Sequence, residues 1–110
     1  MTIYGDGQTS RDFTFIDDVI QANLSAAISE KSDGEAINIA HGETISIRDL
    51  ANMIIEITGS KSSVVCASPR AGDIVYSAAD LTKARKLIGY ESKTSMERGL
   101  SMTIDYFKQL

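Results

Sequence analysis

The chain has 110 residues, 43% hydrophobic and 24% charged, which is the composition of one small globular domain. Its net charge of −4 and its scattered lysines and arginines argue against general binding to nucleic acid. No apolar run is long enough to span a bilayer, the opening MTIYGDGQTS has no signal-peptide pattern, and Cys66 is the only cysteine, so we expect no internal disulfide and a cytoplasmic protein.

The first third of the chain predicts two extended segments and a helix. Residues 2–4 form a short strand before a glycine turn, and residues 11–16 (RDFTFI) alternate polar and apolar side chains, which is typical of extended chain. Asp17 or Asp18 can cap the helix that follows, which should stop near Gly34. The spacing of one set of apolar residues predicts its buried face: Ile20, Leu24, Ala27 and Ile28.

The middle of the chain predicts a strand and a capped helix. Residues 36–40 (AINIA) are a short apolar run that favours a strand. Ser46 and Asp49 have the spacing of a capping box, and Gly59 can close the helix. The buried face of this helix is predicted to consist of Leu50, Met53, Ile54 and Ile57.

The last third predicts one more strand and two more helices. Residues 63–67 form the strand, and residues 68–73 form a loop. Asp80 can cap a short helix that ends at Gly89, and a second capping box at 94–97 opens the final helix. Few short strands mixed with four helices predict a small α/β domain, α+β-like, without a large doubly wound sheet.

Arg11 and Arg70 are the strongest candidates for a binding site. Both occupy loop-like contexts beside predicted strands, and a guanidinium suits phosphate because its planar fork donates two hydrogen bonds and stays charged. The alternative is that they are surface arginines paired with the adjacent acids Asp12 and Asp73. The residues alone favour this alternative.

Other reactive side chains offer no convincing site. Asp6, Asp12, Asp17 and Asp18 do not have the spacing of a calcium loop, and turns and helix caps explain most of them. His41 stands alone, so we expect no metal. Cys66 lies among apolar residues, which predicts a buried structural thiol.

Two catalytic signatures are missing from the sequence. No Gly-x-Gly-x-x-Gly or Gly-x-x-Gly-x-x-Gly occurs, so no dinucleotide fingerprint is present. None of the tyrosines is followed by a lysine four positions later, so the tyrosine–lysine acid/base pair of short-chain dehydrogenases is absent. We therefore expect no catalytic residue and no cofactor-binding residue in this chain.

Three segments together resemble the extended short-chain dehydrogenase/reductase family, in its NAD-dependent epimerase/dehydratase branch. They are IYGDGQTSRDFTFIDDVIQANLSAA at 3–27, AINIAHGETISIRDLANMI at 36–54 and SPRAGDIVYSAADLTKARKLIGYESKTSMERGL at 68–100. The resemblance covers nearly the whole chain in order and is greatest to UDP-glucose 4-epimerase-type enzymes. Ser77 stands where galactose-type epimerases often carry tyrosine, which favours the broader epimerase branch.

The resemblance implies a nucleotide-sugar site. Arg11 and Arg70 match two arginines that contact the diphosphate, so the resemblance reverses the preference for surface pairing. Asp73 matches an acid that accepts from the ribose hydroxyls, and Thr2 and Tyr4 match the strand beside the base.

The same resemblance implies that residues 1–110 are the C-terminal nucleotide-sugar-binding domain of a longer enzyme, without its Rossmann half. NAD and the catalytic residues would belong to that half, and the fragment would be inactive alone and prone to self-association. The leading expectation is a UDP-sugar 4-epimerase. The alternatives are a dTDP-sugar 4,6-dehydratase, a UDP-glucuronate decarboxylase, or a stand-alone binding or structural module.

Overall fold

Strand pairing divides the chain between two small sheets. In the computed structural model, which describes residues 1–110, β1 (Thr2–Tyr4) pairs in parallel with β4 (Val65–Ala67). In the second sheet β2 (Ser10–Arg11) lies between antiparallel β3 (Ile45–Ser46) and parallel β5 (Tyr76–Ser77). The predicted strand at 2–4 is confirmed, and most of the predicted strand at 63–67 is present.

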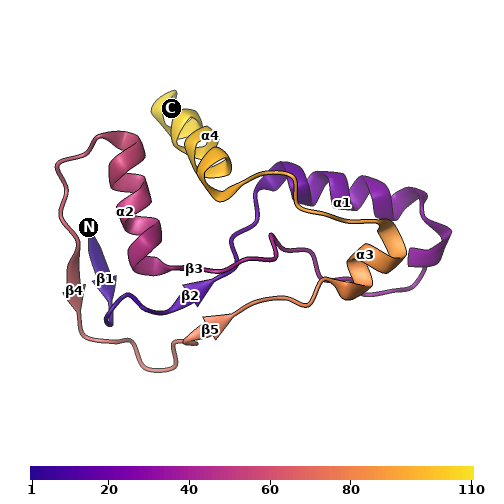
Figure 1. Cartoon of the computed structure of the whole chain (residues 1–110), viewed down its shortest axis with the longest axis horizontal. Helices are drawn as coiled ribbons and strands as arrows, with labels where there is room; N and C mark the ends of the chain where they lie inside the picture. The colour runs from indigo at the N-terminus through magenta and orange to yellow at the C-terminus, as the bar shows by residue number, and fades with distance from the viewer.

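Four helices accompany these short strands, which confirms the predicted small α/β class. They are α1 (Ile16–Ile28), α2 (Ile47–Thr58), α3 (Thr82–Ile88) and α4 (Met96–Lys108), and a 3-10 turn, η1, spans Glu30–Ser32. In Figure 1, α2 stands beside β1 and β4 at one end of the molecule, whereas α1 and α3 lie together at the other end. The second sheet connects the two ends.

Helix α2 follows the predicted signals. The Ser46 hydroxyl accepts a hydrogen bond from the Asp49 amide at 3.0 Å and donates to the Asp49 carboxylate at 2.7 Å. Gly59 ends the helix with φ of 62°, a left-handed conformation that glycine adopts without steric cost. Local signals alone therefore determine both ends of this helix.

The predicted caps of α1 and α4 are wrong. Phe15 precedes α1 without a side-chain cap, and the Asp18 carboxylate faces residues 92–94 instead of its own helix. The Thr94 hydroxyl donates to that carboxylate at 3.2 Å, which leaves Ser95 to cap α4 by accepting from the Arg98 amide at 3.3 Å. A long-range contact thus displaces both caps.

The predicted buried face of α1 is also wrong. Ile20, Leu24 and Ile28 are 46%, 57% and 87% exposed, whereas Ala22 is buried. The small side chain of Ala22 lets α3 and residues 36–40 approach closely. The core they form with α1 consists of Ala22, Ala40, Leu81, Ala84 and Tyr90.

Residues 36–40 form no strand, contrary to the sequence prediction. Ala40 is buried in the core, and Ile37 and Ile39 pack against it. The Tyr90 hydroxyl donates to the Ala40 carbonyl at 2.8 Å. The apolar run therefore contributes to the core as irregular chain, and a side chain rather than a neighbouring strand binds its carbonyl.

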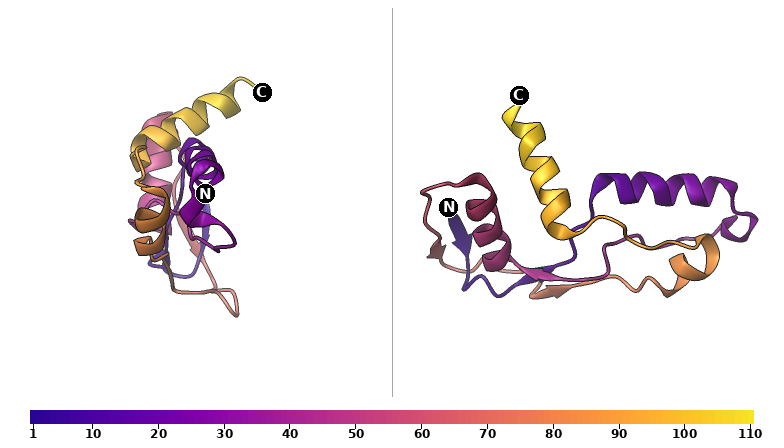
Figure 2. Two further views of the ribbon diagram at one scale, coloured as in Figure 1. Left: turned by 90° about the vertical axis from the view of Figure 1, so that its right-hand side faces the viewer. Right: turned by 45° about the horizontal axis from the view of Figure 1, so that its top comes forward.

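The molecule is elongated and open. Its radius of gyration is 16.5 Å and its extents are 49 × 35 × 20 Å, whereas a compact domain of this length has a radius of gyration of about 13 Å. Only 10 of 110 residues are buried. Figure 2 shows α4 projecting away from the rest of the ribbon. Much apolar surface is consequently uncovered.

Candidate functional site

The residues that the sequence singled out come from both sheets and the loop between them. Thr2 and Tyr4 lie on β1, Arg11 lies on β2, and Arg70 and Asp73 lie in the loop from β4 to β5. Residues 5–9 join β1 to β2 and residues 68–75 join β4 to β5, so these two connections set how the two sheets face each other. The candidate site is an open surface of the molecule.

Tyr4 and Arg70 are in direct contact. The Arg70 guanidinium carbon lies 3.8 Å from the centroid of the Tyr4 ring, within the range of a cation–π interaction. Tyr4 is held by its strand, since it pairs in register with Ala67 and the next amide, of Gly5, donates to the Ala67 carbonyl at 2.9 Å. The loop thus places an arginine on an aromatic ring that a strand keeps in position.

Arg11 and Arg70 have no carboxylate partner. Arg11 is half-buried, and its Nη1 donates to the Ser10 carbonyl at 2.8 Å. The adjacent Asp12 instead accepts from the amides of His41 and Gly42 at 2.8 and 2.9 Å. The two ion pairs in the structure involve other residues, Lys83–Glu35 and Lys108–Asp105. The pairing with Asp12 and Asp73 that we considered as an alternative does not occur.

Asp73 and Thr2 make few contacts with side chains. Asp73 is exposed, and its amide donates to the Arg70 carbonyl at 3.4 Å across a turn. Thr2 is exposed and pairs in register with Val65. The structure therefore brings Tyr4 and Arg70 together, and leaves Arg11, Asp73 and Thr2 on neighbouring segments.

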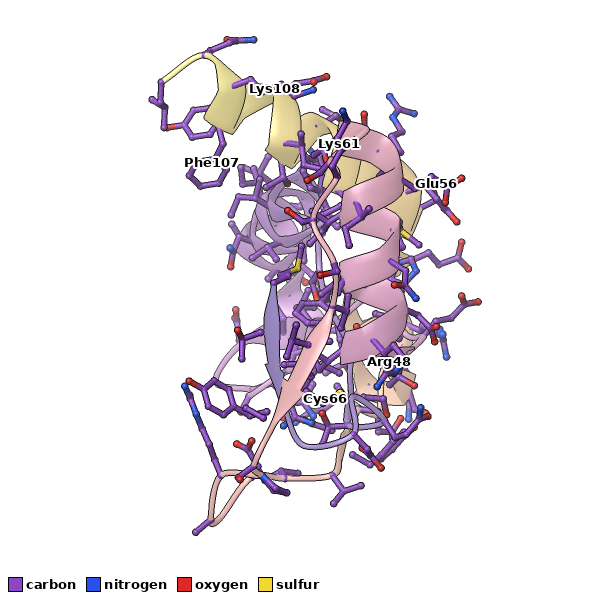
Figure 3. The ribbon with its side chains drawn as sticks, turned by 90° about the vertical axis from the view of Figure 1, so that its left-hand side faces the viewer. Arg48, Glu56, Lys61, Cys66, Phe107 and Lys108 are labelled. Atoms are coloured by element: carbon purple, nitrogen blue, oxygen red, sulfur yellow. The ribbon has the colours of Figure 1, made fainter.

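Arg48 is a residue that the sequence analysis missed. Its Nη2 and Nε donate to the Asp6 carbonyl at 2.7 and 3.2 Å, and Nη2 also contacts the Cys66 sulfur at 3.0 Å. Figure 3 shows Arg48 and Cys66 close together at the start of α2. Cys66 is exposed, so the prediction of a buried thiol is wrong.

Arg48 also explains the glycine turn between β1 and β2. Its amide donates to the Gly7 carbonyl at 3.0 Å, and a Cβ placed on Gly7 would lie 2.9 Å from the Cβ of Arg48. Gly7 has φ of 81°, which a larger residue rarely adopts. Helix α2 thereby holds the turn that separates Tyr4 from Arg11. No local pattern could reveal this, since Arg48 also binds the Asp6 carbonyl in the same turn, 42 residues away along the chain.

Asp18 is the most heavily bonded acid. Its carboxylate accepts from the Ser92 hydroxyl at 2.7 Å, from the amides of Lys93 and Thr94 at 3.3 Å each, and from the Thr94 hydroxyl. Burial pushes the pKa of Asp18 upward, but these hydrogen bonds outweigh burial and leave the pKa below its usual value. Asp18 thus acts as a structural link.

The Asp18 link extends to His41 and Tyr90. The Ser92 hydroxyl donates its one proton to the Asp18 carboxylate. His41 Nδ1 is therefore the donor in its 2.7 Å hydrogen bond with the Ser92 oxygen. Burial, followed by the nearby charges of Asp18 and Asp12, raises the pKa of the Tyr90 hydroxyl. No group of three or more histidine, cysteine or acidic side chains is arranged to hold a metal ion.

An apolar groove of about 230 Å³ has no arginine in its lining. It is lined by residues 13–15, α2 and α4, with Phe13, Phe15, Leu50, Ile54, Met96 and Leu100 as its apolar walls. None of the helices combines the length and the hydrophobicity that a bilayer span requires. The guanidinium groups of Arg11 and Arg70 can each bind an anion, whereas the groove is lined by no acidic, histidine or lysine side chain for acid/base chemistry.

A family model described as "GDP-mannose 4,6 dehydratase" matches residues 1–103. Among curated proteins, a UDP-N-acetyl-alpha-D-glucosaminuronate decarboxylase of Bacillus cytotoxicus is 33% identical over 116 aligned positions, covering all of this chain and 36% of that protein. The chain spans about a third of the length of the curated relatives that it matches.

Two solved structures share both fold and sequence with the chain. The UDP-glucose 4-epimerase of Thermotoga maritima, solved with UDP-glucose, superimposes with a TM-score of 0.92 at 39% identity, covering 99% of this chain and 35% of that one. The UDP-glucuronic acid 4-epimerase of Bacillus cereus, solved with UDP-glucuronic acid and NAD, has a TM-score of 0.89 at 38% identity, covering 98% and 35%.

Proposed function

The chain belongs to the GDP-mannose 4,6 dehydratase family, within the NAD-dependent epimerase/dehydratases, and from this premise we propose that it is the nucleotide-sugar-binding part of a UDP-sugar 4-epimerase. In this proposal residues 1–110 form the C-terminal domain of the enzyme and act in the cytoplasm. The complete enzyme oxidises C4 of the sugar with NAD and returns the hydride to the opposite face.

The observation that carries the proposal is the presence of two arginines without carboxylate partners. Neither Arg11 nor Arg70 forms an ion pair with the protein, so the positive charge of each remains available to an anion. A diphosphate carries about two negative charges, and two guanidinium groups can neutralise it with charge-assisted hydrogen bonds. A UDP-sugar supplies such a diphosphate.

The remaining site residues receive narrower roles in this proposal. The exposed Asp73 carboxylate accepts hydrogen bonds from the ribose hydroxyls, since an ionised acid is an acceptor only. Tyr4 and Thr2 lie on β1 beside the base, where an aromatic ring and a strand edge can contact a planar heterocycle. All these groups orient the substrate and none of them transfers a proton or hydride.

In this proposal the catalytic residues and NAD belong to a second domain of the enzyme, which has a Rossmann fold. The open shape supports this, because apolar side chains of α1 and α4 lack cover. Phe107 projects from α4 in Figure 3 and is 66% exposed. On its own the chain is therefore inactive. It binds nucleotide weakly, because half of the binding pocket that encloses the ligand belongs to the missing part.

A UDP-uronate decarboxylase is the second candidate. The observation that favours this candidate is that the sequence similarity to the decarboxylase of Bacillus cytotoxicus extends over the whole chain. The two candidates use the same diphosphate surface and differ in the second part, where acid and base groups act on the sugar. An assay of the complete enzyme with UDP-glucose and UDP-glucuronate distinguishes them by product.

A titration tests the binding role in this chain. UDP, UDP-glucose and UDP-glucuronate are added to millimolar concentration while the backbone and arginine side-chain resonances are followed by NMR. We expect the resonances of Tyr4, Arg11 and Arg70 to shift and the shifts to saturate as ligand is added. In Arg11→Ala the shifts should no longer reach saturation. The matched control is Arg98→Ala, an exposed arginine on α4. Absence of shifts at these residues would leave only a structural module.

A further inference from the structure

We propose that Tyr4 is a positioning residue that holds the Arg70 guanidinium ready for the diphosphate. This inference rests on the proposed function, and it gives the Tyr4 ring a role in phosphate binding in addition to contact with a base. The contact that carries it is the guanidinium carbon 3.8 Å from the ring centroid.

The backbone that carries the ring is held in a strand, whereas Arg70 lies in an exposed loop. Tyr4 belongs to β1, whose backbone pairs with Ala67, and the Gly5 amide donates to the Ala67 carbonyl at 2.9 Å. Arg70 lies in a loop in which residues 68–73 are all exposed, and the bond that closes its turn, from the Asp73 amide to the Arg70 carbonyl, is 3.4 Å long. The ring contact is the interaction that restricts the Arg70 side chain, which forms no ion pair.

Stacking leaves the guanidinium free to bind an anion. A guanidinium that lies over an aromatic ring uses its flat face, and its N–H donors point outward around the edge. The Arg70 side chain makes no hydrogen bond and no ion pair with another part of the protein. Its donors therefore remain available while its position is restricted.

Restricting a long side chain before binding strengthens binding. A free arginine must lose rotamer freedom when it clamps a phosphate, and that loss weakens the complex. The Tyr4 ring already removes part of that freedom in the unbound protein. Loss of an exposed cation–π contact corresponds to a change of roughly two- to fivefold in affinity.

Inorganic pyrophosphate separates this role from base binding, because it has phosphates and no base. We expect Tyr4→Leu to bind pyrophosphate about two- to fivefold more weakly than the unaltered chain, and Tyr4→Phe to bind it equally well. NMR titration at constant ionic strength gives the affinities. In the free protein, the Arg70 Hδ resonances should show an upfield ring-current shift that Tyr4→Phe keeps and Tyr4→Leu loses.

Arg70→Ala supplies the control that separates this inference from the proposed function. In that background Tyr4→Leu should cause no further loss of pyrophosphate binding. If Arg70→Ala weakens binding but Tyr4→Leu does not, or if Tyr4→Leu strengthens it, the positioning role is wrong and the proposed site remains. If Arg70→Ala leaves pyrophosphate binding unchanged, Arg70 is not a diphosphate ligand and both proposals fail.

Discussion

At the scale of single residues, Asp18 links segments that lie far apart in the chain. Its carboxylate accepts hydrogen bonds from residues 92–94, and Ser92 in turn contacts His41. Asp18 is 4% exposed, so its negative charge depends on these donors for stabilisation. This one acid therefore ties the start of α1 to the segment that precedes α4.

Asp18→Ala should destabilise the fold by roughly 2–3 kcal/mol, because it leaves several donors without an acceptor. Asp17→Ala is the matched control, since the neighbouring acid is exposed and should cost no more than about 1 kcal/mol through the helix dipole. Urea denaturation followed by circular dichroism measures both. Equal losses in the two variants would contradict the linking role of Asp18.

The lowered pKa of Asp18 predicts acid sensitivity with a definite sign. A carboxyl group whose folded pKa lies below its unfolded value, here near 3.8, contributes stability above that value and loses it as pH falls through the folded pKa. The free energy of unfolding should therefore decline below about pH 4. Asp18→Asn should decline less steeply, and parallel pH profiles for the two proteins would exclude this explanation.

At the scale of elements, the approach of α4 to the chain before α1 depends on a glycine. Gly99 is buried in α4, and a Cβ at this position would lie 3.1 Å from Cδ2 and 3.2 Å from Cβ of Phe15. The same two residues line the apolar groove. The missing side chain thus sets the distance between α4 and Phe15.

Gly99→Val should destabilise the fold by about 1–3 kcal/mol, because the larger side chain forces the Phe15 ring away. Met102→Val, on an exposed position of the same helix, should change stability by no more than about 0.5 kcal/mol through helix propensity. Thermal unfolding compares the two. If Gly99→Val were as stable as the unaltered chain, the contact with Phe15 would not limit the packing of α4.

At the scale of the whole molecule, two helices present apolar surface to solvent. Leu24 and Ile28 of α1 and Tyr106 and Phe107 of α4 are between 57% and 87% exposed. Leu24 and Ile28 are four residues apart and so share one face of α1, and an exposed apolar face of this kind is typical of a surface that another protein covers. In the proposed enzyme that cover is the part with the Rossmann fold.

The isolated chain should therefore self-associate, with a sedimentation coefficient that rises with concentration. Leu24→Glu combined with Phe107→Glu should weaken association at least about tenfold, because two large side chains leave the buried surface. Ser60→Glu with Ser62→Glu adds the same charge to an exposed loop and should have no effect. A monomer at all concentrations would contradict this prediction.

Local sequence determined several elements of the fold and the family to which the chain belongs. The cap of α2, the glycines that end α2 and α3, and the strand at 2–4 depend on hydrogen bonds and backbone angles within a few residues, so pattern alone predicts them. The three family-like segments also lie along the chain in order. The roles proposed for Arg11, Arg70 and Asp73 came from that resemblance.

Tertiary structure decided which groups meet. Periodicity identified an apolar face on α1, but only packing showed that Ala22 is buried and Leu24 exposed. The Asp18 carboxylate binds partners more than 70 residues away instead of capping its own helix. The Arg70 guanidinium lies over the Tyr4 ring. Such contacts join segments remote in sequence, and their energies depend on distances that exist only once the chain has folded.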